Sequence, residues 1–249
     1  MTIKQKTIIS MRLTIKLLIL TILPITFYSC SKTDNAVPPN NSNIISDALP
    51  KTDTLNTGME YWTKTTQNNI SFEEPSGWWT TLNTLAKLGA PITVSKTIDK
   101  HNGNYAVKLE SKIWGDTTSE GLLIPGLLTI GRFIYTDPFI LQGNAFTSKP
   151  IGFQGYYKYI SVKGDSAVIY ANISRYNPAK MYSDTIAQAS FVIKNTVSNY
   201  QLFNLNFDYK IMNQQPDSIK IVFVSSGGGE NFKGQAGSTL YIDDIKFVY

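Results

Sequence analysis

The chain has a single histidine, His101, and a single cysteine, Cys30, among its 249 residues. One histidine leaves no HExxH motif and no His-rich zinc site. Gly164-Asp165-Ser166 resembles the start of an esterase block, whose serine needs a histidine base within hydrogen-bond reach. A glycine–aspartate turn between two strands explains that triplet fully, and His101 lies in a polar turn of its own. We therefore expect no histidine-dependent hydrolase and no zinc enzyme.

Basic clusters and helical periodicity are also scarce. The formal net charge is +5, but four of the 23 basic residues and none of the 18 acidic residues precede residue 30, which leaves a net charge of +1 for the rest. A nucleic-acid partner would require a concentrated basic face, and no cluster of Lys and Arg follows Cys30. Helical periodicity is limited to residues 80–89, so strands must form most of the fold.

The amino-terminal segment has the pattern of a lipoprotein signal. A basic start precedes the apolar run 17–28, which is shorter than the about 20 residues that a membrane span needs, and Ser29 and Cys30 follow. This order resembles the lipobox of bacterial lipoproteins, in a loose form similar to that of Bacteroidetes. We predict a signal peptide over 1–29, acylation of Cys30 and a lipid anchor in the outer membrane, with the protein facing the cell surface. The alternative is an ordinary signal peptide with an incidental cysteine, although a free thiol in an oxidising envelope is a liability.

The rest of the chain divides into a tether and a domain. Residues 30–54 are rich in Ser, Asn, Pro and Asp and should form a flexible, disordered tether. Residues 55–249 suffice for one domain, and without a fixed-period repeat they predict an all-β sandwich of the jelly-roll, galactose-binding-like type. The strand signals are short segments rich in β-branched and aromatic residues: 108–114, 155–162, 165–174, 189–195, 200–209, 217–226 and 238–249.

One of these segments is apolar on both faces. Alternation along 217–226 gives each face of the strand its own apolar residues. We therefore expect stacked sheets with a core face and a second, partly covered face. The first face carries Ile219, Ile221 and Phe223, and the second carries Lys220, Val222 and Val224.

The closing segment contains a change of phase. Leu240 and Ile242 point one way, whereas Ile245 falls in the opposite phase, and the change occurs at Asp243-Asp244. One residue of offset turns every later side chain to the other face of a strand, so this pair predicts a β-bulge. The bulge would aim two carboxylates at one local spot.

These carboxylates suggest a metal ion. In jelly-roll carbohydrate-binding modules a structural calcium often ties the first strand to the last, and Glu60 with Asp243 and Asp244 resembles that arrangement. Calcium takes six to eight oxygen ligands, which two strand ends and backbone carbonyls can supply. We predict a structural calcium here, with solvated carboxylates at a bulge as the alternative.

Aromatic residues are the remaining signal for a binding site. Sugar rings stack their C–H faces on Trp and Tyr while their hydroxyls take hydrogen bonds from polar side chains. Trp78, Trp79 and Trp114 are the candidate carbohydrate-binding residues. Adjacent residues of an extended segment face opposite ways, so at most one of Trp78 and Trp79 should be buried. Packing in the core is the alternative for each of the three.

Carboxylates are also candidates for catalysis. A glycosidase needs two of them, about 5 Å apart if retaining and about 6.5–9.5 Å apart if inverting. No spacing in the sequence pairs any two, so no catalytic residue is named and an enzymatic role is left open, with a non-catalytic role favoured. The available acids are Glu73, Glu74, Glu110, Asp116 and Glu120.

From about residue 57 to its end, the chain resembles the carbohydrate metabolism (PCMD) domain of Bacteroidetes lipoproteins. GYYKY with GDSA, and the closing GSTLYIDDI, are the most specific segments. The resemblance implies a β-jelly-roll on the cell envelope that binds or processes glycans. We predict an envelope-anchored lipoprotein that binds a glycan or polysaccharide as part of carbohydrate metabolism. The alternatives are a glycoside hydrolase or lyase using two acidic residues, and a structural or adhesion subunit with an outer-membrane protein partner.

Overall fold

The computed structural model describes residues 55–67, 69–115, 121–134, 140–228 and 234–249. The predicted signal peptide, the tether with Cys30, and the acids Asp116 and Glu120 lie outside the described residues. Within these ranges, no helix has the length and apolar character to cross a membrane.

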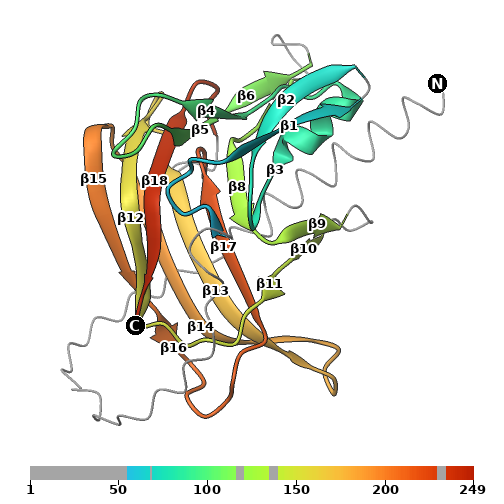
Figure 1. The fold of residues 1–249 in the computed structure, drawn as a ribbon, viewed down its shortest axis with the longest axis vertical. Coiled ribbons are helices and arrows are strands. Elements are labelled where there is room, and N and C mark those ends of the chain that lie inside the picture. Colours follow the sequence, from blue (N-terminus) through green and yellow to red (C-terminus); the bar gives the residue numbers. More distant parts are fainter. Residues whose placement is uncertain (1–54, 68, 116–120, 135–139, 229–233) are drawn as a thin grey trace.

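Two antiparallel sheets pack face to face and confirm the predicted all-β jelly-roll sandwich (Figure 1). The larger sheet has the strand order β16-β14-β13-β17-β8-β3, with β11 beside β17, and the smaller has the order β15-β12-β18-β5-β4. The strands of the seven-stranded sheet are β3 (Trp79–Thr81), β8 (Leu127–Ile130), β11 (Asn144–Ala145), β13 (Ala167–Asn177), β14 (Tyr182–Ile193), β16 (Asp208–Tyr209) and β17 (Ser218–Val224). Those of the five-stranded sheet are β4 (Val94–Thr97), β5 (Ala106–Glu110), β12 (Gly152–Ile160), β15 (Val197–Asn206) and β18 (Thr239–Val248).

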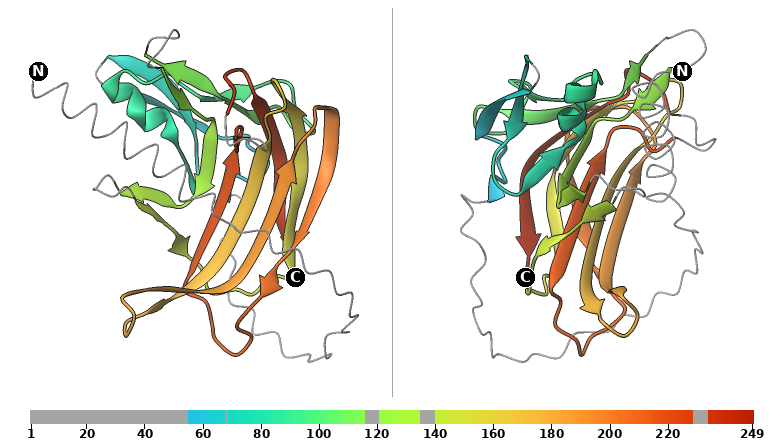
Figure 2. Two further views of the ribbon diagram at one scale, coloured as in Figure 1. Left: turned by 180° about the vertical axis from the view of Figure 1, so that it is seen from behind. Right: turned by 90° about the vertical axis from the view of Figure 1, so that its right-hand side faces the viewer.

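Most of the short elements lie at one end of the long strands, and one short pair lies beside their middle (Figure 2). They form three two-stranded pairs and a 3-10 helix in the region where the sequence allowed a helix. The elements are β1 (Trp62–Gln67) with β2 (Ile70–Pro75), β6 (Lys112–Trp114) with β7 (Leu122–Ile124), β9 (Arg132–Ile134) with β10 (Ile140–Gln142), and η1 (Leu82–Leu88).

Two hydrophobic clusters lie on either side of β17, as its two apolar faces predicted. The main cluster fills the space between the sheets and contains Ile219, Ile221 and Phe223. The second contains Val222 and Val224, which η1, β7 and β9 cover from outside. The side chains along β17 enter the two clusters in turn, because successive side chains of a strand point to opposite faces of the sheet. The seven-stranded sheet is therefore packed on both faces at its β17–β8 side.

A buried carboxamide joins the two sheets at one edge. Asn83, in η1 directly after β3, donates from Nδ2 to the carbonyl of Val94 in β4 at 2.8 Å. Its Oδ1 accepts the backbone N–H groups of Thr93 and Val94, both at 3.0 Å. The side chain thus pairs with β4 as a neighbouring strand would, and all of its polar atoms are satisfied where water is excluded.

The predicted β-bulge at Asp243-Asp244 is confirmed. The register of β12 and β18 shifts between Gln154 and Tyr156, whose partners are Lys246 and Asp243, so β18 has one extra residue. Asp244 has a positive φ of 49°, a conformation that bulges accommodate.

The predicted strand 200–209 is two strands that belong to different sheets. β15 ends at Asn206 in the five-stranded sheet, and β16 begins at Asp208 in the seven-stranded sheet. Between them Phe207 is buried, and its N–H donates to the carbonyl of Ile151 at 2.8 Å. Tyr209 secures the far side of the crossing, because its hydroxyl donates to the carbonyl of Pro150 at 2.8 Å. The chain therefore passes from one sheet to the other within three residues.

Candidate functional site

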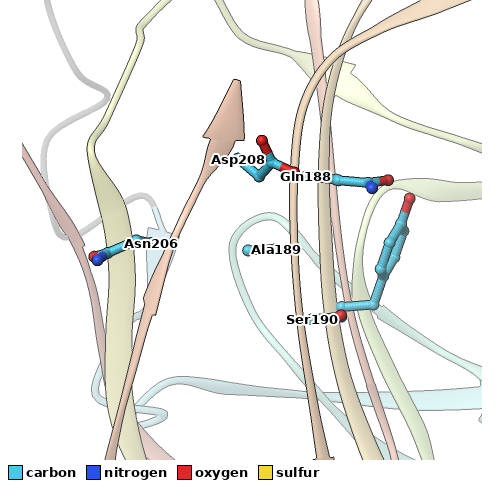
Figure 3. Close-up of a pocket in the computed structure, with 6 residues that line it drawn as sticks. Gln188, Ala189, Ser190, Asn206 and Asp208 are labelled. Carbon is cyan, nitrogen blue, oxygen red and sulfur yellow. The ribbon is translucent and has the colours of Figure 1, made fainter. Parts of the chain in front are cut away.

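A pocket of about 180 Å³ opens where the chain crosses between the sheets (Figure 3). Gln188 and Ser190 come from β14, Asn206 from the end of β15 and Asp208 from the start of β16. Tyr170 of β13 completes the polar lining, with Ala189 beside it. The side chain of Gln188 projects from the outer face of the seven-stranded sheet, whereas that of Asn206 points the opposite way, on the outer face of the five-stranded sheet (Figure 3). The polar side chains on the first of these faces are an aromatic hydroxyl, one carboxamide, a serine hydroxyl and a carboxylate.

The strand register brings together the side chains that come from β13, β14 and β16. Tyr170 lies opposite Ser190, and Asn172 lies opposite Gln188, which in turn lies opposite Asp208. Residues directly opposite each other in an antiparallel pair project from the same face of the sheet. Because Tyr170 alternates with the core residues of β13, this shared face is the outer face of the seven-stranded sheet.

Part of the pocket wall is a sheet edge. Strand β16 pairs with β14 only at Ala187 and Gln188. Among the described strands, no other one pairs with this side of β14, so its backbone from Ala189 onward is an edge. Edge strands offer unpaired N–H and C=O groups. The pocket therefore has main-chain donors and acceptors as well as polar side chains.

The environment of the pocket differs from one side to the other. Tyr170 packs against the second hydrophobic cluster, and burial raises the pKa of its hydroxyl, which a hydrogen bond with Asn172 partly offsets. On the opposite side Asp208 is exposed and forms an ion pair with Lys210. One wall is thus apolar and rigid, and the other is charged and open to water.

The carboxylates predicted to hold calcium instead bind the turn before β5. The Oδ2 atom of Asp243 accepts the N–H of His101 at 2.9 Å, and the Oδ2 atom of Asp244 lies 2.6 Å from the imidazole Nδ1 of His101. Glu60 accepts the N–H of Asn104 at 2.8 Å. The structure therefore brings all three carboxylates to one turn, and residues of that turn form hydrogen bonds with each of them.

This donor set does not fit calcium. Backbone N–H groups point at the oxygens of Asp243 and Glu60 that a cation would need. Across the described ranges, no group of three or more His, Cys, Asp or Glu residues is placed to hold a metal ion. Burial, with a smaller contribution from the charge of Asp244, raises the pKa of Asp243 to about 6. The residues that the structure describes at this turn therefore do not supply the calcium site predicted from the sequence.

The outer face of the five-stranded sheet has aromatic side chains, but their rings are engaged within the protein. The His101 ring stacks on Tyr156 with centroids 3.4 Å apart and planes inclined by 10°. The ammonium of Lys158 lies 4.2 Å from the centroid of the Tyr241 ring. The hydroxyl of Tyr200 donates to a main-chain carbonyl of the loop before β5 at 2.7 Å. This loop therefore covers the surface on which a sugar would otherwise stack.

The predicted tryptophans lie in or against the hydrophobic clusters. Trp79 is 6% exposed in the main cluster, and Trp114 is 8% exposed in the second. Trp78 is partly buried against the main cluster. Packing, the alternative given above, accounts for Trp79 and Trp114, and neither forms an exposed platform.

The acids considered for catalysis are engaged with separate partners. Glu73 forms an ion pair with Lys96 at 2.9 Å, and Glu110 forms one with Lys108 at 2.9 Å. Burial raises the pKa of Glu74 to about 7, while the hydroxyl of Thr81 donates to its carboxylate. The geometry of these described acids assigns no acid–base pair.

The family model of the "putative carbohydrate metabolism domain", PCMD, matches residues 54–248. The chain belongs to this family. The match confirms the resemblance seen in the sequence and gives the PCMD chain a carbohydrate-related function. A search among curated proteins finds no match.

Solved structures from two Bacteroides species share the PCMD fold. One is a putative glycoside hydrolase from Bacteroides vulgatus ATCC 8482, with a TM-score of 0.62 and 22% identity, over 77% of this chain and 96% of that one. Another is a putative glycoside hydrolase from Bacteroides thetaiotaomicron VPI-5482, with a TM-score of 0.59 and 21% identity, over 79% of this chain and 69% of that one. At such identities the likeness shows the fold.

Proposed function

We propose that this PCMD domain binds a carbohydrate chain, without cleaving it, in the pocket between β14 and the β15–β16 crossing. The observation that carries the proposal is the lining itself: a tyrosine beside the carboxamide of Gln188, a serine and Asp208. Carboxamides and carboxylates hydrogen-bond to vicinal hydroxyls, and an aromatic ring packs against the C–H face of a sugar. The carbohydrate-related family supports this choice of ligand.

The state of the other sheet favours the same pocket. The aromatic rings on the five-stranded sheet already contact His101, Lys158 and the loop before β5. A sugar would have to displace these contacts before it could stack there. At the pocket, by contrast, the edge of β14 and the exposed side chain of Ser190 are open to a ligand.

Binding of glycans by the full-length chain, purified in detergent, tests the proposal. Isothermal titration against a panel of neutral and acidic polysaccharides should give heat with at least one of them. Gln188→Ala and Ser190→Ala should each weaken that affinity about two- to tenfold, the effect of losing one hydrogen bond of about 0.5–1.5 kcal/mol. Asn204→Ala is the control, because Asn204 lies exposed on β15 outside the pocket.

Three results would oppose the proposal. An absence of heat with every glycan would remove the binding function, and equal effects of Asn204→Ala and Gln188→Ala would remove the pocket. Release of reducing ends from the bound glycan would show hydrolysis, the alternative predicted from the sequence.

We also propose that the domain is held at the outer membrane by acyl chains on Cys30. The signal pattern and the tether composition before the domain support this anchor. At the cell surface, glycans and neighbouring outer-membrane proteins are the available partners. Mass spectrometry of the mature chain should find an acylated amino-terminal cysteine, and Cys30→Ser should move the protein out of the membrane fraction. An unmodified wild-type cysteine would contradict the anchor.

A further inference from the structure

A row of polar residues runs from the pocket across the outer face of the seven-stranded sheet. Lys220 of β17 lies opposite Asn172 of β13, which lies opposite Gln188 of β14, which lies opposite Asp208 of β16. Opposite residues share a face, so these four side chains form one line perpendicular to the strands. Neighbouring strands are about 4.8 Å apart, which places the backbone of Lys220 about 10 Å from that of Gln188.

The two ends of this row differ in charge balance. Asp208 already has a cationic partner in Lys210. Lys220 has none: in the part of the chain that the structure describes, no carboxylate lies within ion-pair distance of its ammonium. The partly buried position of Lys220 lowers its pKa, and no neighbouring negative charge opposes this effect. Several other lysines form ion pairs: Lys96, Lys108, Lys158, Lys180 and Lys210.

The surroundings explain why Lys220 is held in this position. Lys220 projects from the same face of β17 as Val222 and Val224, so it lies at the border of the second hydrophobic cluster. Its neighbour Asn172 is buried, and the carboxamide donates to the hydroxyl of Thr185 at 3.2 Å. A cation that has lost part of its water and has no partner is costly, and an anionic ligand would offset that cost.

We infer that the glycan bound by this domain is acidic and that Lys220 binds its anionic group while the neutral part occupies the pocket beside Gln188. This inference rests on the proposed function and adds the class of ligand and its orientation. The anionic group is a carboxylate, as in a uronic acid, or a sulfate ester, since both accept hydrogen bonds from an ammonium. The charged end lies toward β17, and Asp208 with Lys210 marks the other end.

Paired probes test the charge directly. The full-length chain is titrated with polygalacturonate and its methyl ester, with alginate and its ester, and with a sulfated galactan and its desulfated form. We expect at least one acidic member to bind about tenfold or more tightly than its neutral partner. The pair that shows this preference tells a carboxylate from a sulfate.

Variants then assign the preference to one residue. Lys220→Met, which keeps the length of the side chain, should reduce the preference for the acidic probe to about one while leaving the affinity for the neutral probe unchanged. Lys220→Arg should retain it. Lys246→Met is the matched control, because Lys246 is exposed on β18 in the other sheet. Circular dichroism and the unfolding midpoint confirm that each variant is folded.

Salt gives an independent readout. Raising the ionic strength should weaken binding of the acidic probe to the wild type and leave its residual binding to Lys220→Met nearly constant, because the screened charge is then absent. Tight binding of a neutral glycan with equal affinity for its acidic partner would overturn the inference and leave the proposed function intact. No binding to any probe would overturn both.

Discussion

The buried carboxyl group of Glu74, which lies beside the Thr81 hydroxyl, should make the stability of the protein depend on pH. Burial raises its pKa from the ordinary 4.5 to about 7, although Thr81 donates to it at 2.6 Å. The folded protein therefore keeps the proton at pH values where the unfolded chain releases it. Stability contributed by this group is complete below pH 4.5 and is lost as the pH rises through 7.

The magnitude follows from the size of the shift. A difference of one pKa unit corresponds to about 1.4 kcal/mol, so ionising Glu74 in the fold costs on the order of 3 kcal/mol at pH 8. Glu74→Gln keeps an acceptor for the Thr81 hydroxyl and cannot ionise. We expect the variant to exceed the wild type in free energy of unfolding by up to that amount at pH 8 and to lose this advantage near pH 4.5.

Denaturant unfolding of the full chain at pH 4.5, 6 and 8 measures this difference. Asp243, whose pKa burial raises to about 6, adds its own pH dependence to both proteins, and taking the difference removes it. Glu73→Gln is the control, because Glu73 is the exposed neighbour that pairs with Lys96. A constant difference between wild type and Glu74→Gln across this range would refute the reasoning.

Three further substitutions probe the packing around this edge and the core. Asn83→Ala should lower the free energy of unfolding by about 3 kcal/mol or more in urea titrations, since it leaves three buried backbone groups without partners. Gly126→Ala should lower the melting temperature by several degrees, at a cost of about 2 kcal/mol, because the added Cβ would lie 2.4 Å from the backbone nitrogen of Glu110. Thr81→Val should raise the pKa of Glu74 further, seen by NMR titration of its carboxyl, and cost about 1 kcal/mol through loss of the η1 cap. An unchanged stability in either of the first two, or an unchanged titration in the third, would contradict the corresponding contact.

The sequence predicts the long strands well because their side-chain alternation is local. The two apolar faces of β17 anticipated both hydrophobic clusters, and the phase change at Asp243-Asp244 anticipated the bulge. The same reasoning fails at Phe207, where alternation continues while the chain changes sheets. Nothing local distinguishes a continuous strand from two strands that pair with different neighbours.

The pocket escaped prediction for the same reason. Tyr170 and Gln188 alternate with apolar residues in their own strands, which marks them as facing away from a core. Their proximity depends on the pairing of β13, β14 and β16, which the sequence does not specify. The sequence also did not reveal the second hydrophobic cluster, in which Trp114 packs with residues of η1 and β7 instead of forming an exposed surface.

The crossing at Phe207 gives the pocket two walls that are anchored independently. Asn206 ends β15 of one sheet and Asp208 begins β16 of the other, and Phe207 is the single residue between these two strands. A bound ligand that contacts both walls would connect the two sheets at the edge where they separate. We therefore expect ligand binding to slow amide hydrogen exchange in β14 and β15 together, although the two strands belong to different sheets.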